Sequence, residues 1–271
     1  MADALSEIRL QSLEDLALDL ARVAGATILP LFRADHGLEN KAGGGAFDPV
    51  TAADKGAEAA IRQALKARFP EHGVIGEEYG QDRPDAEFVW VLDPIDGTRA
   101  FVAGLPLWTT LIALRHQGEP VVGVIAQPYL DEIYVGSGGR ARLIRSGGSK
   151  PLSVRPCPVL TEAVIATTDP ELFNGAELGA WTQLRAAARI ARFGCDAYAF
   201  AMVAQGTMDL VVESGLKAWD IDAAVPVIEG AGGMITDWRG ARLGRDGGQV
   251  AVAGDRGCLD EALAALRRSA A

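Results

Sequence analysis

The 271-residue chain predicts a mixed α/β fold in which helices stack on sheets in two lobes. Apolar residues recur at helical spacing near the N-terminus, and short apolar runs bounded by turn residues fill the middle of the chain. Strand-like and helix-like segments then alternate through the second half. Gly, Ser and Pro gather between residues 140 and 160. We therefore place the boundary there, between an N-terminal lobe at 1–145 and a C-terminal lobe at 146–271.

Two helices are expected in the first lobe. Ser12 and Asp15 resemble a capping box, which predicts a helix start at Ser12. A second helix is expected at residues 52–69, where Pro70 stops it. The first helix would bury an apolar face made by Leu13, Leu16, Leu20, Val23, Ile28 and Leu31.

Strands are expected where short apolar runs are bounded by polar residues. Residues 88–93 predict a buried strand, and 107–115, 120–128 and 132–136 predict an antiparallel meander. In the second half we expect strands at 163–167, 208–212, 233–236 and 249–253, and helices around 181–190, 197–204, 220–230 and through Leu266.

Composition and charge limit the possible functions. A formal net charge of −10 disfavours a broad surface for nucleic acid or anionic lipid. Cys157, Cys195 and Cys258 lack C-x-x-C spacing, so we expect reduced, buried thiols. No stretch approaches the roughly 20 apolar residues of a membrane span, and the N-terminus lacks the features of a signal peptide. These observations predict a cytoplasmic protein that binds neither nucleic acid nor membrane.

The strongest chemical signal is LDPIDGTRAF. The expected strand delivers Asp93 at its C-terminal end, and Pro94 is expected to end the strand. In a tight turn Asp96 could point at the same spot, where the two carboxylates would repel each other unless a cation lay between them. Gly97 and Thr98 then offer backbone N–H groups at a helix start, which suits a phosphate. A solvated turn in which Asp96 caps the helix explains the segment equally well.

Three further segments place acids at chain turns. GEE puts Glu77 and Glu78 after a short apolar pair, and DPVTAAD puts Asp54 at the start of the second helix. WDIDAA puts Asp220 at another helix start, where an Asp is also an ordinary N-cap. Each segment alone is typical of ordinary structure. Together they supply carboxylates, whereas the three histidines are scattered, so Mg²⁺ or Mn²⁺ is favoured over zinc.

The ordered segments DPVTAAD, GEE, DPIDGT and WD before GAGG resemble the signature of the inositol monophosphatase family, over about residues 15–255. The resemblance implies that family's α+β layered sandwich, an αβαβα architecture whose two lobes form one catalytic unit, usually as a homodimer. It also implies a phosphomonoesterase that uses metal-activated water, with two or three Mg²⁺ ions (or Mn²⁺) and often sensitivity to lithium.

Carried over position by position, the resemblance implies a role for each matching residue. Lys41 resembles the loop lysine before the first segment, although the glycines that follow loosen its spacing, and Glu78 would support the site from behind. The implied catalytic groups are Asp54, Thr98 and Glu77, the first two orienting and activating the water. The implied metal ligands are Glu77, Asp93, the Ile95 carbonyl, Asp96 and Asp220. The implied substrate-binding residues are Gly97, Thr98, Arg99, Asp196 and Glu213.

The expected substrate is a small phosphorylated metabolite. Arg99 and residues 193–233 resemble the histidinol-phosphatase branch more than the inositol branch, where Asn commonly replaces that Arg. Histidinol carries an amine and an imidazole, so Asp196 and Glu213 near the leaving alcohol would suit it. Inositol hydroxyls would also accept Glu213, and an exposed Asp196 could simply be the N-cap of a helix that starts at Ala197.

The first hypothesis is therefore hydrolysis of histidinol phosphate to histidinol and phosphate, in histidine biosynthesis. An inositol-1-monophosphatase or a broad-specificity sugar phosphatase is the alternative. A non-catalytic binding protein on the same fold is a third, from a different class.

Overall fold

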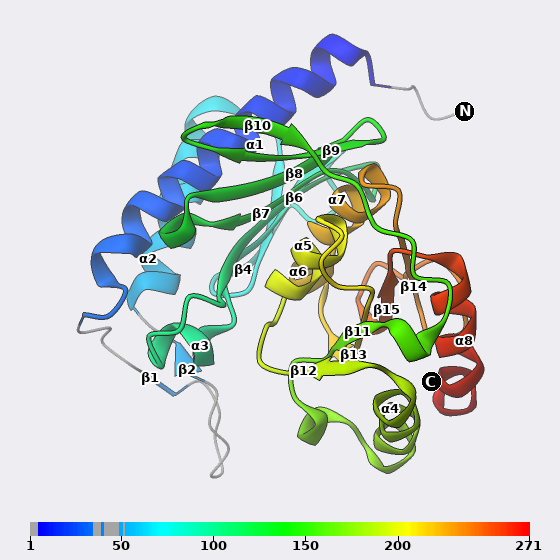
Figure 1. The fold of residues 1–271 in the computed structure, drawn as a ribbon. Helices are drawn as coiled ribbons and strands as arrows, with labels where there is room; N and C mark the ends of the chain where they lie inside the picture. Colours follow the sequence, from blue (N-terminus) through cyan, green and yellow to red (C-terminus); the bar gives the residue numbers. More distant parts are fainter. Residues whose placement is uncertain (1–4, 35–38, 41–48, 51) are drawn as a thin grey trace.

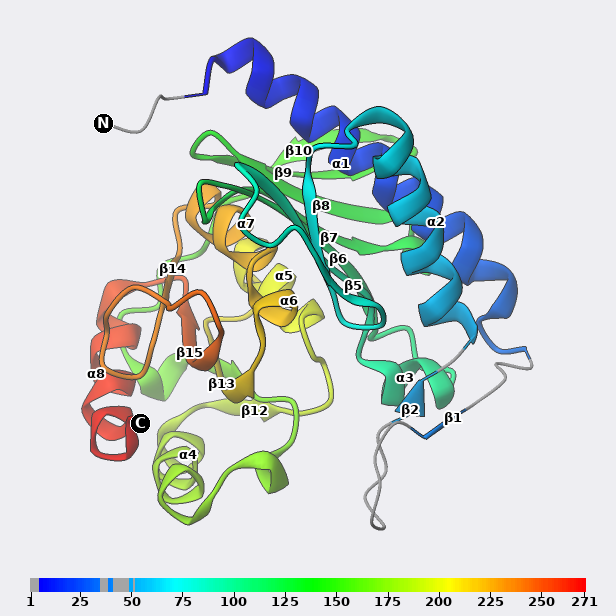
Figure 2. The same cartoon turned by 180° about the vertical axis from the view of Figure 1, so that it is seen from behind.

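The computed structural model describes residues 5–34, 39–40, 49–50 and 52–271. Two helices cover one face of an eight-stranded sheet, three shorter helices lie between that sheet and a five-stranded sheet, and two more cover the outer face of the second sheet (Figures 1 and 2). This layered sandwich confirms the predicted αβαβα architecture. In that order, the helices are α1 (Glu7–Ile28) and α2 (Ala52–Arg68); α5 (Tyr198–Ala204), α6 (Ala218–Ile221) and α7 (Ala224–Gly230); α4 (Gly175–Ala187) and α8 (Arg256–Leu266).

The eight-stranded sheet has the order β10-β9-β8-β7-β6-β5-β3-β4. Neighbouring strands are antiparallel except β3 and β5, which are parallel. The predicted meander is therefore present as β6, β7 and β8, joined by short turns. The strands are β3 (Gly73–Gly76), β4 (Gly80–Asp82), β5 (Phe88–Asp96), β6 (Thr109–His116), β7 (Glu119–Gln127), β8 (Glu132–Ser137), β9 (Arg140–Arg145) and β10 (Gly148–Pro151).

The five-stranded sheet has the order β12-β11-β13-β15-β14. Beside these two sheets lie a two-stranded pair, β1 (Glu39–Asn40) with β2 (Pro49–Val50), and the short helix α3 (Thr98–Val102). The strands of the second sheet are β11 (Val164–Ala166), β12 (Ile190–Arg192), β13 (Leu210–Leu216), β14 (Met234–Thr236) and β15 (Gly248–Ala253).

The start of α1 differs from the prediction. The helix begins at Glu7, and Ser6 is its N-cap, accepting a hydrogen bond from the backbone N–H of Arg9. Ser12 lies inside the helix, where its hydroxyl donates to the carbonyl of Ile8. The capping box at Ser12 is therefore wrong, because the apolar face on which that prediction depended begins more than a turn after the helix itself. Val23 also lies off that face, with 36% of its surface exposed.

The helix predicted at 220–230 is in fact two helices, α6 and α7. Pro226 explains the break. In one continuous helix its ring would clash with the carbonyl of residue 222, whereas in the first turn of a new helix its missing N–H is no loss. The break leaves α6 only four residues long.

Both sheets share one apolar core. Ile125 and Tyr134 of the first sheet pack in the same buried cluster as Val211 and Val252 of the second. β10 ends at Pro151 and β11 begins at Val164, so the division into lobes at 145/146 stays a prediction. The three cysteines are free and buried, as predicted.

Candidate active site

Asp93 and Asp96 lie on β5, where its pairing with β6 is interrupted. Asp93 pairs with Leu111 and Asp96 pairs with Thr109, so three steps along β5 match two steps along β6. Residues three apart in a regular strand face opposite sides of the sheet. The one extra residue makes a bulge, which turns Asp96 back to the face of Asp93.

Pro94 lies within this bulge, and the prediction that it ends the strand is wrong. A bulge leaves a residue out of the hydrogen-bonded ladder, so a residue without an N–H is tolerated there. The Pro94 carbonyl accepts a hydrogen bond of 2.8 Å from the hydroxyl of Thr110 on β6. This bond holds the irregular segment against the neighbouring strand.

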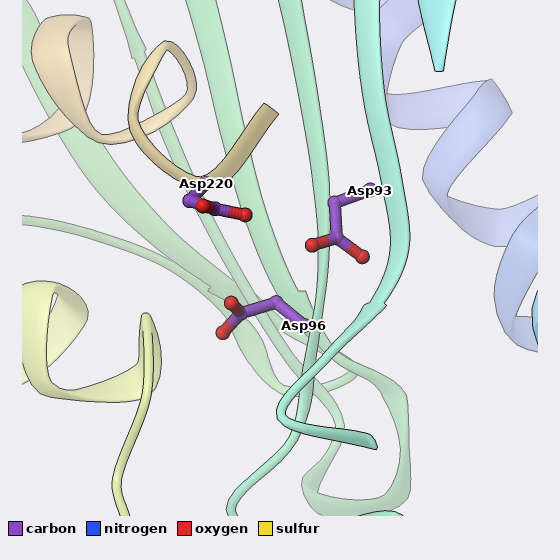
Figure 3. A group of neighbouring side chains, drawn as sticks. All are labelled: Asp93, Asp96 and Asp220. Carbon is purple, nitrogen blue, oxygen red and sulfur yellow. The ribbon is translucent and has the colours of Figure 1, made fainter. Parts of the chain in front are cut away.

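Asp220 approaches the same place from α6. One carboxylate oxygen from each of Asp93, Asp96 and Asp220 lies within 4.8 Å of the other two, and Figure 3 shows the three carboxylates facing one another from β5 and α6. Asp220 is not the N-cap of its helix, because Lys217 holds that position. Its Oδ2 instead accepts from the backbone N–H of Lys217 at 2.7 Å, which orients the carboxylate.

The electrostatics of the cluster are unfavourable for a bare chain. Desolvation and then the charge of Glu77 raise the pKa of Asp93 well above its usual range. Desolvation, followed by the charges of Asp196 and Asp220, does the same for Asp96. Burial, opposed by the Lys217 hydrogen bond and assisted by the charge of Glu77, raises the pKa of Asp220 to about 7.

One oxygen of the cluster, Oδ1 of Asp93, has no hydrogen-bond partner among the described residues. Asp93 is itself only 2% exposed. A buried polar atom without a partner costs free energy. Several carboxylate oxygens converging on one point are the ligands that Mg²⁺ and Mn²⁺ prefer. The residues present therefore fit a divalent cation.

Glu77 and Asp54 border this cluster. Glu77 follows β3, and its N–H donates to the Leu92 carbonyl on β5, which extends the pairing of the two strands. Its charge raises the pKa values of all three clustered aspartates. Asp54, 1% exposed in the first turn of α2, adds to the raised pKa of Asp93.

Glu58 is a supporting residue that sequence reasoning missed. It is fully buried on α2 and accepts hydrogen bonds from the N–H groups of Glu78 at 2.8 Å and Tyr79 at 3.2 Å. Gly76 is required for this contact, because a Cβ there would lie 2.1 Å from Glu58 Oε1. Glu58 thus holds the turn that presents Glu77. Its signal in the sequence is an acid among the apolar residues of an amphipathic helix.

Gly97 and Thr98 form the predicted start of a helix after Asp96. Gly97 has φ of 83°, a left-handed conformation that suits glycine. Thr98 opens α3, and its hydroxyl donates to the Ile95 carbonyl at 3.0 Å. The hydroxyl oxygen can still accept a hydrogen bond, and the carbonyl keeps a second lone pair.

Asp196 borders the cluster, because its charge raises the pKa values of Asp96 and Asp220, and it also raises the pKa of Glu213. Asp196 packs against Gly97, since a Cβ at Gly97 would lie 3.2 Å from the Asp196 carboxyl carbon. Burial raises the pKa of Asp196 to about 6 and that of Glu213 to about 8. Glu213, on β13, accepts hydrogen bonds from the hydroxyl of Thr167 and from the N–H and hydroxyl of Thr168.

The N-cap alternative for Asp196 is wrong. The residue is partly buried, its φ is 45°, and α5 has no side-chain cap. Asp96 instead accepts the hydrogen bond from the N–H of Ala197, at 2.7 Å. The Asp196 carboxylate is therefore free of the capping duty that the sequence allowed.

Arg99 is exposed at the rim. Its guanidinium lies 3.7 Å from the carboxylate of Asp169, and its charge lowers the pKa of Asp196 against the larger effect of burial. Lys41 lies outside the described residues, as do Asp48 and Thr51 of the DPVTAAD segment. Among helices in the described ranges, none is both long and apolar enough to cross a bilayer.

Comparison with known proteins places the chain in one family. Residues 9–271 match the model of the Inositol monophosphatase family. The chloroplastic bifunctional phosphatase IMPL2 of Arabidopsis thaliana is 41% identical, over 92% of this chain and 71% of that protein. A histidinol-phosphatase of Chlorobaculum parvum is 35% identical, over 86% of this chain and 88% of its own. The solved structure of an inositol monophosphatase from Zymomonas mobilis superposes with a TM-score of 0.85 at 40% identity, over 95% of this chain and 98% of that chain.

Proposed function

The chain belongs to the inositol monophosphatase family of phosphoric monoester hydrolases, and from this premise we propose that it is a Mg²⁺-dependent phosphatase that hydrolyses histidinol phosphate to histidinol and phosphate. This would be a step of histidine biosynthesis. Two observations support the metal dependence: carboxylate oxygens of Asp93, Asp96 and Asp220 lie within 4.8 Å of one another, and the buried Oδ1 of Asp93 has no donor in the described part of the chain.

The proposed metal ligands are carboxylates and one carbonyl. Two or three Mg²⁺ ions, or Mn²⁺, would be held by Glu77, Asp93, Asp96, Asp220 and the carbonyl of Ile95. When bound, such cations supply positive charge to the phosphate and lower the pKa of water. The raised pKa values of the aspartates fit this role. They show that the ionised carboxylates are unfavourable without a counter-charge, which a bound cation would supply.

Thr98 and Asp54 are the proposed partners of the attacking water. The Thr98 hydroxyl donates to Ile95, so its oxygen is directed to accept a hydrogen bond from the water. Asp54 would take up the water's proton from its buried position at the start of α2. Glu77 would help to position the water through the metal that it binds. Gly97 would let a phosphate approach the backbone closely. No covalent phospho-enzyme is required.

Asp196 is the proposed contact for the cationic end of histidinol. It adjoins Gly97 on one side and influences the pKa of Glu213 on the other, so it lies between the proposed phosphate seat and the buried acid. Glu213 already accepts hydrogen bonds from Thr167 and Thr168. It therefore suits the role of a fixed hydrogen-bond acceptor more than that of a charge that distinguishes cationic from neutral alcohols. An exposed ion pair such as Arg99–Asp169 contributes about 0–1 kcal/mol, so Arg99 remains available to the substrate.

The relatives support two substrates. The similarity to a histidinol-phosphatase at 35% identity supports histidinol phosphate. The similarity to an inositol monophosphatase structure at 40% identity supports the alternative, an inositol-1-monophosphatase or broad sugar phosphatase. The acid at position 196 favours the first, since a cationic alcohol gains more than a neutral one from a carboxylate. The homodimer and the cytoplasmic location stay predictions.

The deciding experiment compares phosphate release from histidinol phosphate, inositol 1-phosphate and glycerol phosphate, each with Mg²⁺ and with EDTA. We expect the highest kcat/KM for histidinol phosphate and no release from any ester in EDTA. A preference for inositol 1-phosphate would establish the alternative. Absence of metal-dependent release from every ester would leave the non-catalytic binding protein.

A further inference from the structure

A buried ion pair joins strand β6 to the residue that follows α6, the helix that carries Asp220. Arg115 is 7% exposed and Asp222 is 6% exposed. The guanidinium binds both carboxylate oxygens, with Nε 2.5 Å from Oδ2 and one terminal nitrogen 3.1 Å from Oδ1. The same nitrogen also donates to the carbonyl of Arg245 at 2.7 Å. The Asp222 carboxylate is thereby fully engaged and does not belong to the three clustered carboxylates.

The helix that carries Asp220 is too short to be stable on its own. α6 spans four residues, Ala218–Ile221, and an isolated helix of that length is unstable because nucleation costs more than so few hydrogen bonds return. Asp220 lies within it, two residues before Asp222. The position of the Asp220 carboxylate therefore depends on what anchors α6 to the rest of the fold.

The other end of the pair belongs to the strand beside Asp93. Arg115 is on β6, where it pairs with Val89 of β5; four residues earlier on β6, Leu111 pairs with Asp93. A continuous path of ladder hydrogen bonds thus runs from Arg115 to Asp93. The ion pair closes the path by joining β6 to the segment that carries Asp220.

Contacts of a different kind fix the chain just after the pair. Gly123 on β7 and Gly136 on β8 let the segment approach the sheet, since a Cβ at these positions would lie 2.1 Å from the Ala223 carbonyl oxygen and 2.2 Å from that of Pro226. These close approaches set the start of α7. They do not reach α6 itself, and a cavity of about 50 Å³ borders Arg115, Ile221 and Asp222.

We propose that Arg115 and Asp222 are positioning residues that set where the Asp220 carboxylate meets Asp93 and Asp96. A buried ion pair adds little stability over apolar side chains of the same size, because desolvation offsets its attraction. A two-pronged guanidinium–carboxylate contact does fix direction, which apolar packing does not. The inference rests on the proposed metal-binding role of Asp220.

The test is Mn²⁺ binding to the full-length, chelator-stripped protein, followed by the electron paramagnetic resonance signal of free Mn²⁺, with no substrate present. Loss of a residue that orients a metal ligand commonly weakens affinity about ten- to a hundredfold. We expect that increase in Kd for Asp222→Asn, and a smaller one for Arg115→Lys, which keeps the charge but loses the fork.

A second ion pair supplies the matched control. Arg155 binds both oxygens of buried Asp209 at 2.7 and 2.6 Å, just before β13 and outside the carboxylate cluster. Asp209→Asn should lower the melting temperature and leave the Kd for Mn²⁺ within about twofold of wild type, since it disturbs no metal ligand or its orientation. Equal weakening by Asp209→Asn and Asp222→Asn would overturn the proposal, because the effect would then follow stability alone.

The double variant Arg115→Met/Asp222→Leu covers the case in which Asp222→Asn does not fold. It leaves no unpaired buried charge, so it should fold, yet it should still bind Mn²⁺ more weakly because its apolar side chains impose no direction. Wild-type affinity in this variant or in folded Asp222→Asn overturns the positioning role alone. If the wild-type protein binds no Mn²⁺, the proposed metal site fails and the inference fails with it.

Discussion

Buried carboxylates are stabilised in two different ways in this protein. Asp222 and Asp209 each meet a guanidinium, Arg115 or Arg155, that binds both of their oxygens. Asp93, on β5, is buried just as deeply, but its Oδ1 has no donor among the described residues. The groups that surround it are themselves acids. The chain's own arginines neutralise Asp222 and Asp209, whereas Asp93 requires a cation from outside the chain.

Glu213 falls between these two kinds. Three donors from Thr167 and Thr168 satisfy its oxygens, but all three are neutral. Burial therefore still raises its pKa to about 8. A carboxyl group that is held in place by neutral donors is suited to accept a hydrogen bond from a polar ligand, as proposed above for Glu213.

The largest expected effect is that of Asp93→Asn. At saturating Mg²⁺ it should lower phosphate release at least about a hundredfold, since even residues that only orient metal ligands are commonly worth ten- to a hundredfold. The same change removes a repelled charge, so the melting temperature of the metal-free protein should not fall. Activity and thermal melting of the purified variant measure both effects. Near wild-type turnover would make Asp93 a turn residue.

The control for this prediction is Asp209→Asn, which leaves Arg155 without its partner. Because Arg155 is partly exposed, the unfolding free energy should fall by about 1–3 kcal/mol, less than for a fully buried pair. Turnover of the folded variant should be unchanged. Opposite effects of the two Asn substitutions on stability would confirm the contrast, and a matching loss of stability in both would remove it.

Thr98→Ala should lower kcat about 10²–10⁴-fold, the range for removal of one positioned catalytic group, and change KM much less. The reason is that the hydroxyl acts on the attacking water, which matters most in the transition state. Thr98→Ser keeps the hydroxyl and should retain most of the activity. Steady-state kinetics on the preferred ester measure this, and a change confined to KM would instead assign Thr98 to substrate binding.

Asp196→Asn should lower kcat/KM for histidinol phosphate about ten- to a hundredfold, which corresponds to a charged hydrogen bond of about 1–3 kcal/mol. Kinetics with glycerol phosphate should barely change, because a neutral alcohol does not need the charge. Asp169→Asn, which removes an acid nearer the surface, should affect both esters less. Equal losses on the two esters in Asp196→Asn would assign that residue to the fold or the metal site.

The smallest expected effect is on stability against pH. Burial raises the pKa values of Asp196, Asp220 and Glu213 to about 6, 7 and 8, against about 4 for an exposed carboxyl. The folded chain thus holds more protons than the unfolded chain between about pH 4 and 8, so the unfolding free energy falls as pH rises through that window.

Melting temperatures of the metal-stripped protein should therefore be a few degrees, roughly 2–8 °C, lower at pH 8 than at pH 6. Saturating Mg²⁺ should reduce the difference, because it stabilises the ionised carboxylates. A metal-free protein that is more stable at pH 8 would contradict the unfavourable electrostatics of the cluster.

Hydrophobic periodicity and turn residues predicted helices stacked on sheets and most of the inner strands, whereas the order of the layers was predicted from the family resemblance. The strands β4, β9, β10 and β12 were not predicted; β4, β10 and β12 lie at sheet edges, and all four carry few apolar residues of their own. The break before Pro226 was readable from the proline itself but was missed. The helix start at Ser6 was missed because the first turn of α1 is mostly exposed and carries no apolar stripe.

The acids of the site could be named from the sequence, but their geometry could not. The bulge that aligns Asp96 with Asp93 depends on the register with β6, which no local pattern specifies. Arg115 meets Asp222 across 107 residues of chain, so neither residue signals its partner. The signal in the sequence was Arg115 at the end of an apolar strand, because a buried charge requires a counter-charge elsewhere in the chain.

The most direct test of the contrast between Asp93 and the carboxylates that arginines neutralise is calorimetric titration of Mg²⁺ into chelator-stripped protein, with phosphate release followed over the same concentrations. We predict saturable binding in the wild type that parallels recovery of activity, and loss of both in Asp93→Asn. Full phosphate release by wild-type protein from which all divalent cations have been removed would contradict the requirement for a cation at this site.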